Sequence, residues 1–396
     1  MKKIIFLLLT VASVAAWGQS LPVVKPGRAG MNEQRLSYAD AAIRQSIRKG
    51  LIPGAVLAVV RHRKIAYLKA YGNKQVYPDT IPMTVQTVFD LASVSKPVST
   101  AISTMILLER GQLRLRDNVS MYIPYFQPWT DTITGHVRNI RVIDLLTHTS
   151  GLPPYAPVEE LKQIYATPAP DGLMDYISCV ARNNEPATVF DYSCLNFITL
   201  QRIIENISGM SLQEFARQNI FYPLKMEHTD YNPAGETLAW VAPTAVQADG
   251  FVLKGTVHDP LANVMNAGVS GNAGVFSNAG DLCVLAAMLL NDGEINGTRI
   301  LSPLTVRAMR TVPAGYEAFG RSLGWDVFSP YSKDGDLFDV TAYGHTGYTG
   351  TAITLDPETG TAVILLTNRV HPKDRAGITR LYDIVATVVA ASIEKP

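Results

Sequence analysis

Segments with the composition of β-strands lie near both ends of this 396-residue chain, and this placement constrains the fold more than any other feature. Five such segments occur, at residues 54–61, 64–71, 340–346, 351–355 and 361–367. Only His62 and Arg63 separate the first two, which predicts an antiparallel hairpin. Residues 356–360 (DPETG) supply turn chemistry between the last two. We therefore expect one antiparallel sheet of about five strands, completed by both ends of the chain.

The residues between the two strand groups are predicted to form helices and loops. Apolar residues recur at helical spacing in four stretches, residues 98–110, 198–207, 212–221 and 281–290. Further helices are predicted at 31–49 and 374–393, next to the strand groups. We expect an α/β domain made of residues 31–92 and 318–396, with a mainly helical domain, residues 93–317, inserted between them.

Composition excludes several classes of protein. Hydrophobic residues make up 47% of the chain and the net charge is +1, so neither disorder nor a nucleic-acid partner is favoured. No Cys or His cluster has metal-ligand spacing, and we predict no metal and no cofactor. Of the three cysteines, Cys179 and Cys194 could form a disulfide, but free thiols are the favoured interpretation because a large domain needs no cross-link.

The first eighteen residues have the pattern of a secretory signal peptide. Lys2 and Lys3 precede an apolar run, residues 4–14, and small residues follow up to Gly18. The alternative is an N-terminal membrane anchor, but the run is too short to span a bilayer comfortably. We expect residues 1–18 to be removed, residues 19–30 to be a linker, and the mature protein to be secreted into a bacterial periplasm without a stable membrane anchor.

The main chemical motif is a serine followed three residues later by a lysine. The sequence SVSK at 93–96 follows an extended segment and opens an apolar helical stretch, so the amine of Lys96 can reach the hydroxyl of Ser93. A serine is an effective nucleophile when an adjacent base takes its proton, and Lys96 can do so if its pKa is depressed. Alone, the motif is more often a helix cap followed by a solvated lysine. The same spacing at Ser46 and Lys49 falls near a helix C-terminus, where we predict no reaction.

Two later motifs complete an ordered set. Tyr192-Ser193-Cys194 lies in the middle segment, and Gly-His-Thr-Gly at 344–347 ends a predicted strand. Ser-x-x-Lys, then a Tyr motif, then a Lys/His-Thr-Gly strand resembles the signature of the serine β-lactamase and penicillin-binding protein superfamily. The chain is most similar to the class C β-lactamase and D,D-carboxypeptidase branch, and the similarity continues through most of the mature chain, including residues 145–152, 222–226 and 268–282.

This resemblance implies a role for each motif. Ser93 would attack a carbonyl and form an acyl-enzyme, while Lys96 and Tyr192 share proton transfer. The backbone amides of Ser93 and Tyr348 would form the oxyanion hole. The strand residues His345, Thr346 and Gly347 would bind the substrate, with their edge pairing with its extended backbone. A lone His on a strand is more often structural, but the flanking glycines and the order of the motifs favour a function for His345.

One departure from the family pattern concerns substrate recognition. The Tyr motif of the family usually ends in Asn, whereas this chain has Cys194, with Asn196 two residues later. A thiol is a weak hydrogen-bond partner, which argues against efficient β-lactam hydrolysis. We still expect Cys194, Asn196 and Asn272 to contact the substrate. Asn272 lies in a glycine-rich loop that could equally be a simple turn, and His148 is predicted to be a turn residue at the edge of the site.

Three functions follow from these motifs. The first is a secreted serine hydrolase acting on amide bonds of D-Ala peptides or β-lactams. The second is a carboxylesterase on the same scaffold, and the third is a non-catalytic binder or sensor of cell-wall fragments. The expected partner is a small-molecule or peptidoglycan-derived substrate, and we expect a monomer.

Overall fold

The computed structural model describes residues 21–375 and 377–394. The predicted signal peptide, residues 1–18, lies outside this part of the chain. Six antiparallel strands form the main sheet, in the order β11-β12-β13-β1-β2-β3. Their bounds are β1 Gly54–Arg61, β2 Lys64–Gln75, β3 Ile81–Pro82, β11 Tyr343–Gly347, β12 Thr351–Asp356 and β13 Thr361–Thr367.

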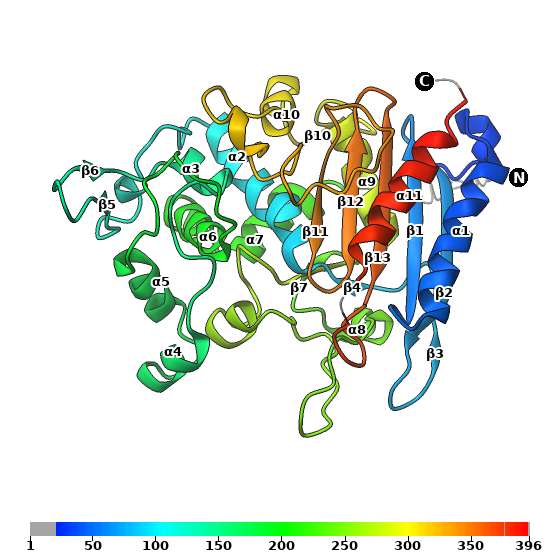
Figure 1. Cartoon of the computed structure of the whole chain (residues 1–396), viewed down its shortest axis with the longest axis horizontal. Helices are drawn as coiled ribbons and strands as arrows, with labels where there is room; N and C mark the ends of the chain where they lie inside the picture. The colour runs from blue at the N-terminus through cyan, green and yellow to red at the C-terminus, as the bar shows by residue number, and fades with distance from the viewer. Residues whose placement is uncertain (1–20, 376, 395–396) are drawn as a thin grey trace, which may run out of the picture.

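The two ends of the chain meet at the centre of this sheet. β1 pairs with β2 on one side and with β13 on the other, so the N-terminal hairpin joins the C-terminal strands (Figure 1). His62 and Arg63 both have positive φ, as a two-residue type I′ hairpin turn requires. The predicted α/β fold, with one antiparallel sheet built from both ends of the chain, is confirmed.

The sheet differs from the prediction in one added strand and in several strand ends, and β11 and β12 each end one residue later than predicted. The sheet has a sixth, two-residue strand, β3, and β2 runs on to Gln75. β11 begins at Tyr343 instead of residue 340, because a turn precedes it. In this turn the Asp339 carboxylate accepts hydrogen bonds from the backbone N–H and the hydroxyl of Thr341, at 2.9 and 2.7 Å.

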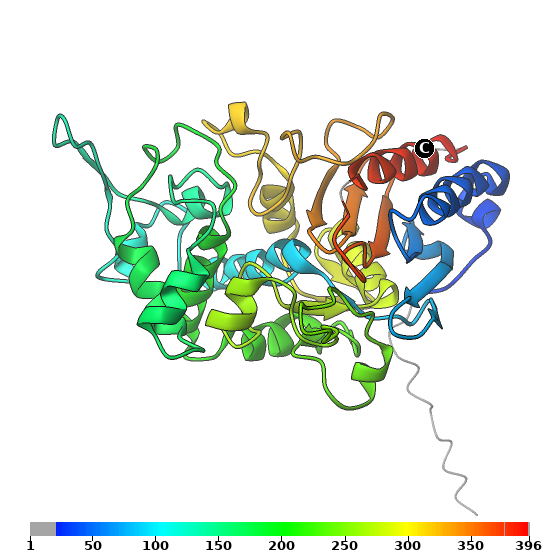
Figure 2. The ribbon, with the colours of Figure 1, turned by 60° about the horizontal axis from the view of Figure 1, so that its bottom comes forward.

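Helices cover both faces of the sheet. α1 (Glu33–Arg48) and α11 (Thr379–Ala391) lie side by side on one face, and α9 (Ala279–Leu290) packs on the other (Figure 2). β1 serves both layers: Ala55, Leu57 and Val59 pack under α1 and α11, whereas Val56 and its alternate neighbours face the large core on the α9 side. This is why β1 is apolar throughout. α9 falls within the segment predicted as the helical domain, and the predicted domain boundaries stay a prediction.

Most of the remaining helices form the second part of the molecule, on the far side of β11, whereas α8 (Gly235–Trp240) lies below β13 in the view of Figure 1. The predicted helix at 98–110 begins as the π-helical segment η3 (Lys96–Ala101) and continues as α2 (Ile102–Glu109). The other α-helices are α3 Val142–Leu146, α4 Val158–Ile164, α5 Pro170–Cys179, α6 Cys194–Ser208, α7 Leu212–Ala216, α8 Gly235–Trp240 and α10 Pro303–Arg310. The smaller strands are β4 Phe89–Asp90, β5 Trp129–Thr130, β6 Val137–Arg138, β7 Asp230–Tyr231, β8 Val275–Ser277, β9 Glu294–Ile295 and β10 Thr298–Arg299.

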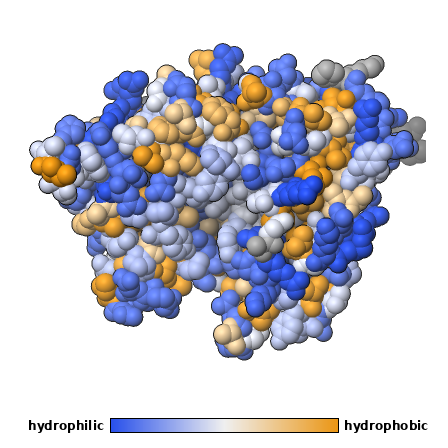
Figure 3. All heavy atoms as spheres, in the orientation of Figure 1, coloured by the Kyte–Doolittle hydropathy of each residue, from blue (hydrophilic) through white to orange (hydrophobic). Residues whose placement is uncertain are grey.

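The surface and the thiols show no unusual feature. On the face drawn in Figure 3, hydrophobic side chains gather in several groups on an otherwise polar surface. Among the described residues, no helix is both long and apolar enough to cross a membrane. Cys179, Cys194 and Cys283 are all free thiols, in agreement with the favoured interpretation of the sequence.

Candidate active site

A buried carboxylate holds the turn that presents Ser93. Ser93 lies in the 3-10 turn η2 (Ala92–Val94), directly after β4. Ala92 has a φ of 45°, a left-handed conformation that is uncommon for a residue with a Cβ. One oxygen of Asp90 accepts the Ala92 N–H at 2.9 Å, and the other accepts the His258 N–H at 2.7 Å. Burial raises the pKa of Asp90 to about 6.

The connection from β11 into β12 is hydrogen-bonded to the segment just before Ser93. Thr349 donates its hydroxyl hydrogen bond to the carbonyl of Asp90 at 2.7 Å, and Thr351 donates to the carbonyl of Leu91 at 2.8 Å. The two segments approach so closely at Gly347 that a Cβ there would lie 2.3 Å from the Leu91 carbonyl oxygen. The Gly of the strand motif is therefore required by packing against the nucleophile turn.

Lys96 lies directly beneath Ser93. Its side chain is fully buried, and its amine donates to the Ser93 hydroxyl and to the Asn272 carbonyl, each at 3.0 Å. Burial alone lowers the pKa of Lys96, but the Cys194 and Tyr192 side chains and the hydrogen bond with Tyr192 outweigh it and the net direction is upward. This upward direction favours the ammonium form of Lys96 and does not favour the depressed pKa on which a base role for the lysine would depend.

Tyr192 lies between several rings at the mouth of the site. Its ring stacks on His148 at 4.3 Å and on Tyr331 at 5.3 Å between centroids, and the Lys96 amine lies 5.1 Å from its centre. His148 is fully buried with a φ of 57°, and its Nδ1 accepts the backbone N–H of Ser193 at 3.1 Å. His148 is therefore a turn residue, as predicted, and its buried ring supports the tyrosine.

His345 is held in a single neutral form. Its Nδ1 lies 2.8 Å from the Thr346 carbonyl, which can only accept, and its Nε2 lies 3.1 Å from Nη2 of Arg321, which can only donate. These partners require the Nδ1–H tautomer. Burial, and then the charges of Arg321 and Lys96, hold the pKa of His345 far below its ordinary value. Both ring nitrogens are occupied by the protein, so a substrate can meet only the carbon edge of this ring.

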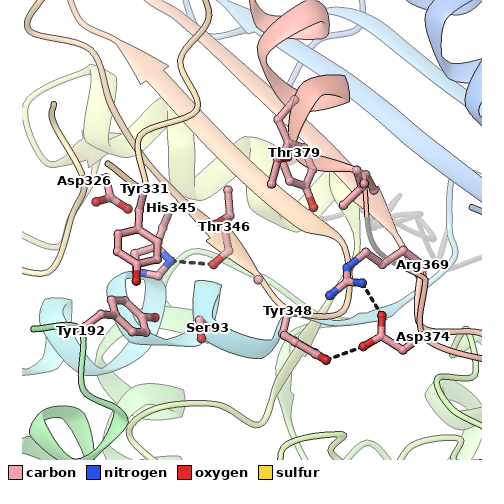
Figure 4. A pocket seen from close by; sticks show the side chains of 14 residues that line it. Ser93, Tyr192, Asp326, Tyr331, His345, Thr346, Tyr348, Arg369, Asp374 and Thr379 are labelled. Atoms are coloured by element: carbon pink, nitrogen blue, oxygen red, sulfur yellow. Dashed lines mark hydrogen bonds and ion pairs between the residues drawn. The ribbon is translucent and has the colours of Figure 1, made fainter. Parts of the chain in front are cut away.

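A pocket of about 660 Å³ opens over these residues (Figure 4). Ser93 and Tyr192 lie at one end, and the exposed edge of β11 forms one wall. The far end is formed by Tyr348, whose hydroxyl donates to Asp374, and by Arg369, which forms an ion pair with the same carboxylate. Among the described residues, no group of three or more His, Cys, Asp or Glu side chains could hold a metal ion.

Comparison of the sequence with known proteins identifies the family of this chain. Residues 39–387 match the family model described as Beta-lactamase. The chain belongs to the β-lactamase family. A relative from Escherichia coli (strain K12), provisionally named a D-alanyl-D-alanine carboxypeptidase, is 30% identical over 93% of this chain and 91% of its own length. This β-lactamase-family protein is therefore a serine hydrolase, and the interpretation as a non-catalytic binder is disfavoured.

Solved structures show the same fold. EstCE1, described as a hydrolase with promiscuous acyltransferase activity, is 23% identical and superposes with a TM-score of 0.72 over 90% of this chain and 99% of its own. A class C β-lactamase is 20% identical and superposes with a TM-score of 0.70 over 92% of this chain and 97% of its own. At these identities the likeness concerns the fold alone.

The structure brings most of the predicted site residues of this family member together. Six of them line the pocket: Ser93, Tyr192, His345, Thr346, Gly347 and Tyr348. Cys194 lies behind them, with its thiol 3.6 Å from the Lys96 amine, and burial raises its pKa so that it stays protonated. Asn272 is fully buried and offers its carbonyl to Lys96.

Asn196, like Cys194 and Asn272, is a predicted substrate contact that does not line the pocket. Its side chain is fully buried in the first turn of α6, where its oxygen accepts the Ser150 hydroxyl and its nitrogen lies 3.2 Å from His148 Nδ1. It supports the histidine beneath Tyr192 and does not line the pocket. A position two residues after the Tyr motif falls on the buried face of this helix, which spacing alone does not reveal.

Several residues of the site were missed by sequence reasoning. Tyr331, Asp326 and Arg369 line the pocket, and Arg321 lies behind it. None of them belongs to a motif, and an isolated Arg or Asp is usually a solvated surface residue. Tyr382 also lines the pocket, and one feature of the sequence indicated its place. The helix predicted at 374–393 contains it and is expected to lie next to the strands that form the pocket.

Proposed function

We propose that this protein is a secreted D,D-carboxypeptidase-type hydrolase that cleaves peptides ending in D-Ala-D-Ala through an acyl-enzyme on Ser93. The observation that carries the proposal is the 3.0 Å hydrogen bond between the Lys96 amine and the Ser93 hydroxyl, in a pocket that Tyr192 also lines. The relative from Escherichia coli, similar over nearly its whole length, supports the choice of substrate.

In the proposed mechanism, Tyr192 takes the proton and Lys96 supplies charge. Lys96, as an ammonium ion, stabilises the anionic form of the tyrosine and donates to the Ser93 oxygen. Tyr192 accepts the Ser93 proton while the serine oxygen attacks the substrate carbonyl. The amides of Ser93 and Tyr348 stabilise the resulting oxyanion. Tyr192 then gives the proton to the leaving D-Ala nitrogen, and the C–N bond breaks.

Hydrolysis of the acyl-enzyme uses the same groups in reverse. Tyr192 takes a proton from a water molecule, the hydroxide attacks the acyl carbonyl, and the proton returns to the departing oxygen of Ser93. The end of β11 and the residue after it, from Thr346 to Tyr348, provide backbone groups that can pair with an extended peptide. This segment faces the pocket in Figure 4.

A carboxylesterase is the second candidate, and Cys194 is the observation that favours it. Cys194 is half-buried behind the pocket residues, burial raises the pKa of its thiol, and a thiol hydrogen-bonds an amide group much more weakly than a side-chain amide does. An ester has no N–H to be recognised, so its hydrolysis would suffer less. As a carboxylesterase, this protein would differ in function from its amide-cleaving relatives because of Cys194.

A substrate panel separates the two candidates. The mature protein, residues 19–396, is assayed with a D-Ala-D-Ala peptide, a penicillin and an aryl acetate, with Ser93→Ala as the control. Release of D-Ala that Ser93→Ala abolishes supports the carboxypeptidase. Ester hydrolysis with no release of D-Ala and no penicillin turnover selects the carboxylesterase and rejects the first proposal.

The proposed location is tested separately. The signal peptide predicts that protein secreted by its native cell begins at Gln19 and is found outside the cytoplasm. Terminal sequencing of the fractionated protein measures both properties. An intact N-terminus in the cytoplasmic fraction would contradict the proposal.

A further inference from the structure

Arg321 is a buried cation next to the proton-transfer residue. Its side chain is fully buried, and its guanidinium carbon lies 5.4 Å from the centre of the Tyr192 ring. It forms an ion pair with Asp326 and donates to Nε2 of His345 at 3.1 Å. No motif contains this arginine, and the catalytic roles derived above do not use it.

The backbone fixes Arg321 in this position. Arg321 and Asp326 form a β-bridge with each other, and Asp326 forms a second bridge with Gly344 of β11, through two backbone hydrogen bonds of 2.9 Å. The Asp326 carboxylate also accepts the hydroxyl of Ser329. The arginine is therefore attached to the same strand that carries His345, and its distance from Tyr192 is set by β11.

The other groups around Tyr192 leave Arg321 and Lys96 as its nearby cations in the described part of the chain. His148 stacks on the ring and His345 lies 6.1 Å from it, and burial and the nearby cations keep both pKa values far below the ordinary value. The remaining ring neighbour is the phenol of Tyr331. Arg321 itself stays charged at neutral pH, because burial lowers its pKa only to about 10.

We propose that Arg321 is a positioning residue for acyl transfer, whose buried charge stabilises the anionic form of Tyr192 that takes the Ser93 proton. The proposal rests on the role of Tyr192 in the proposed function. Arg321 acts from the side of β11 and Lys96 from the side of η3, so the Tyr192 ring lies near two cations, at 5.4 and 5.1 Å from its centre. Arg321 also donates a hydrogen bond to Nε2 of His345. The histidine therefore stays neutral, and the arginine carries the positive charge on this side of the site.

A purely structural ion pair would look similar in the coordinates, but it differs in its effect on pH dependence. Replacing both charges by neutral isosteres, Arg321→Gln with Asp326→Asn, removes the cation without leaving a buried carboxylate unpaired. Replacing only the anion, Asp326→Asn, leaves Arg321 charged and less neutralised. An electrostatic role requires the two variants to shift the pH profile in opposite directions.

The experiment measures kcat/KM against pH for hydrolysis of p-nitrophenyl acetate by the mature protein and both variants. We expect the acidic limb of the profile to move upward by a fraction of a pH unit in the double variant, which removes the cation together with the carboxylate that partly neutralises it, and downward in Asp326→Asn. Circular dichroism checks that each variant is folded. If the double variant does not fold, the downward shift in Asp326→Asn alone carries the test.

Two results would overturn the proposal: a loss of rate with an unmoved acidic limb, or a shift of the acidic limb in the same direction in both variants. Failure of the proposed function is distinguishable, because a parent that releases no D-Ala still gives an ester profile. The ester reaction must depend on Ser93, which Ser93→Ala establishes beforehand.

Discussion

The close approach of β11 to the nucleophile turn makes Gly347→Ala a sharp test of how the site is built. A Cβ at this position would lie 2.3 Å from both the Leu91 carbonyl oxygen and the Thr351 hydroxyl, about 1 Å closer than the 3.4 Å at which ordinary contact begins. The Leu91 atom belongs to the backbone two residues before Ser93, so it cannot rotate away. Either the nucleophile turn or the end of β11 must move by roughly this amount.

The magnitude of the effect follows from this displacement. A misplacement of about 1 Å in a catalytic group costs about 10²-fold in rate, whereas overpacking of this kind destabilises a fold by about 1–3 kcal/mol. We therefore expect Gly347→Ala to fold, with a reduced melting temperature, and to lose about 100-fold in kcat for ester hydrolysis. The change moves the Tyr348 amide relative to Ser93, so kcat should fall more than KM rises.

Gly27→Ala is a matched control, because Gly27 has an ordinary φ and no atom lies within 4 Å of its added Cβ. This variant should equal the parent in kcat and in melting temperature. Steady-state kinetics and a thermal melt of the three proteins suffice. A Gly347→Ala enzyme that stays within threefold of the parent would refute the claim that this contact sets the geometry of the site.

Three further predictions concern single side chains. Lys96→Met should lower kcat/KM by about 10²–10⁴-fold without lowering the melting temperature, because it removes a buried charge that has no carboxylate bonded to it; a large loss of stability would contradict this. Cys194→Asn should raise the ratio of amide to ester kcat/KM by about tenfold, the value of one added hydrogen bond, and a lower ratio would refute the role given to the thiol. Asp90 has a pKa of 3.8 in a model compound and about 6 in the fold, so the folded protein holds a proton that the unfolded chain loses, and stability is lost as pH rises from about 4 to 6. Asp90→Asn should abolish this loss, which amounts to up to about 3 kcal/mol of unfolding free energy between pH 4 and pH 6. Urea unfolding at several pH values measures it, and an unchanged pH dependence would contradict the prediction.

The fold was predictable because its main signal is local. β1 is buried on both faces, so it is a continuous apolar run, and the two-residue connection at His62 and Arg63 leaves a hairpin as the simple solution. The start of β11 was misplaced because the turn at Asp339 depends on a side-chain hydrogen bond. Apolar composition carries no information about such a bond.

The site was predictable where its residues follow one another in the chain. Ser93 and Lys96 are three residues apart on one turn, and spacing alone brought their side chains together. Arg321 and Asp90 are active-site supports that only the tertiary structure identifies, since their partners lie far away in the sequence. The pKa of Lys96 likewise depends on Tyr192 and on other distant neighbours, which explains why the direction of its shift was not predictable.

The central claim is that Ser93, and no neighbouring hydroxyl, carries the acyl group. Ser95 is the natural comparison, since it lies two residues away but is fully buried, with its oxygen accepting the Val275 N–H at 3.0 Å. The most direct measurement is mass spectrometry of the enzyme quenched in acid during turnover of p-nitrophenyl acetate, followed by mapping of the acetylated peptide. The account predicts acetyl on Ser93 in the parent and in Ser95→Ala, and none in Ser93→Ala. Acetylation at any other residue, or an adduct that persists in Ser93→Ala, would contradict it.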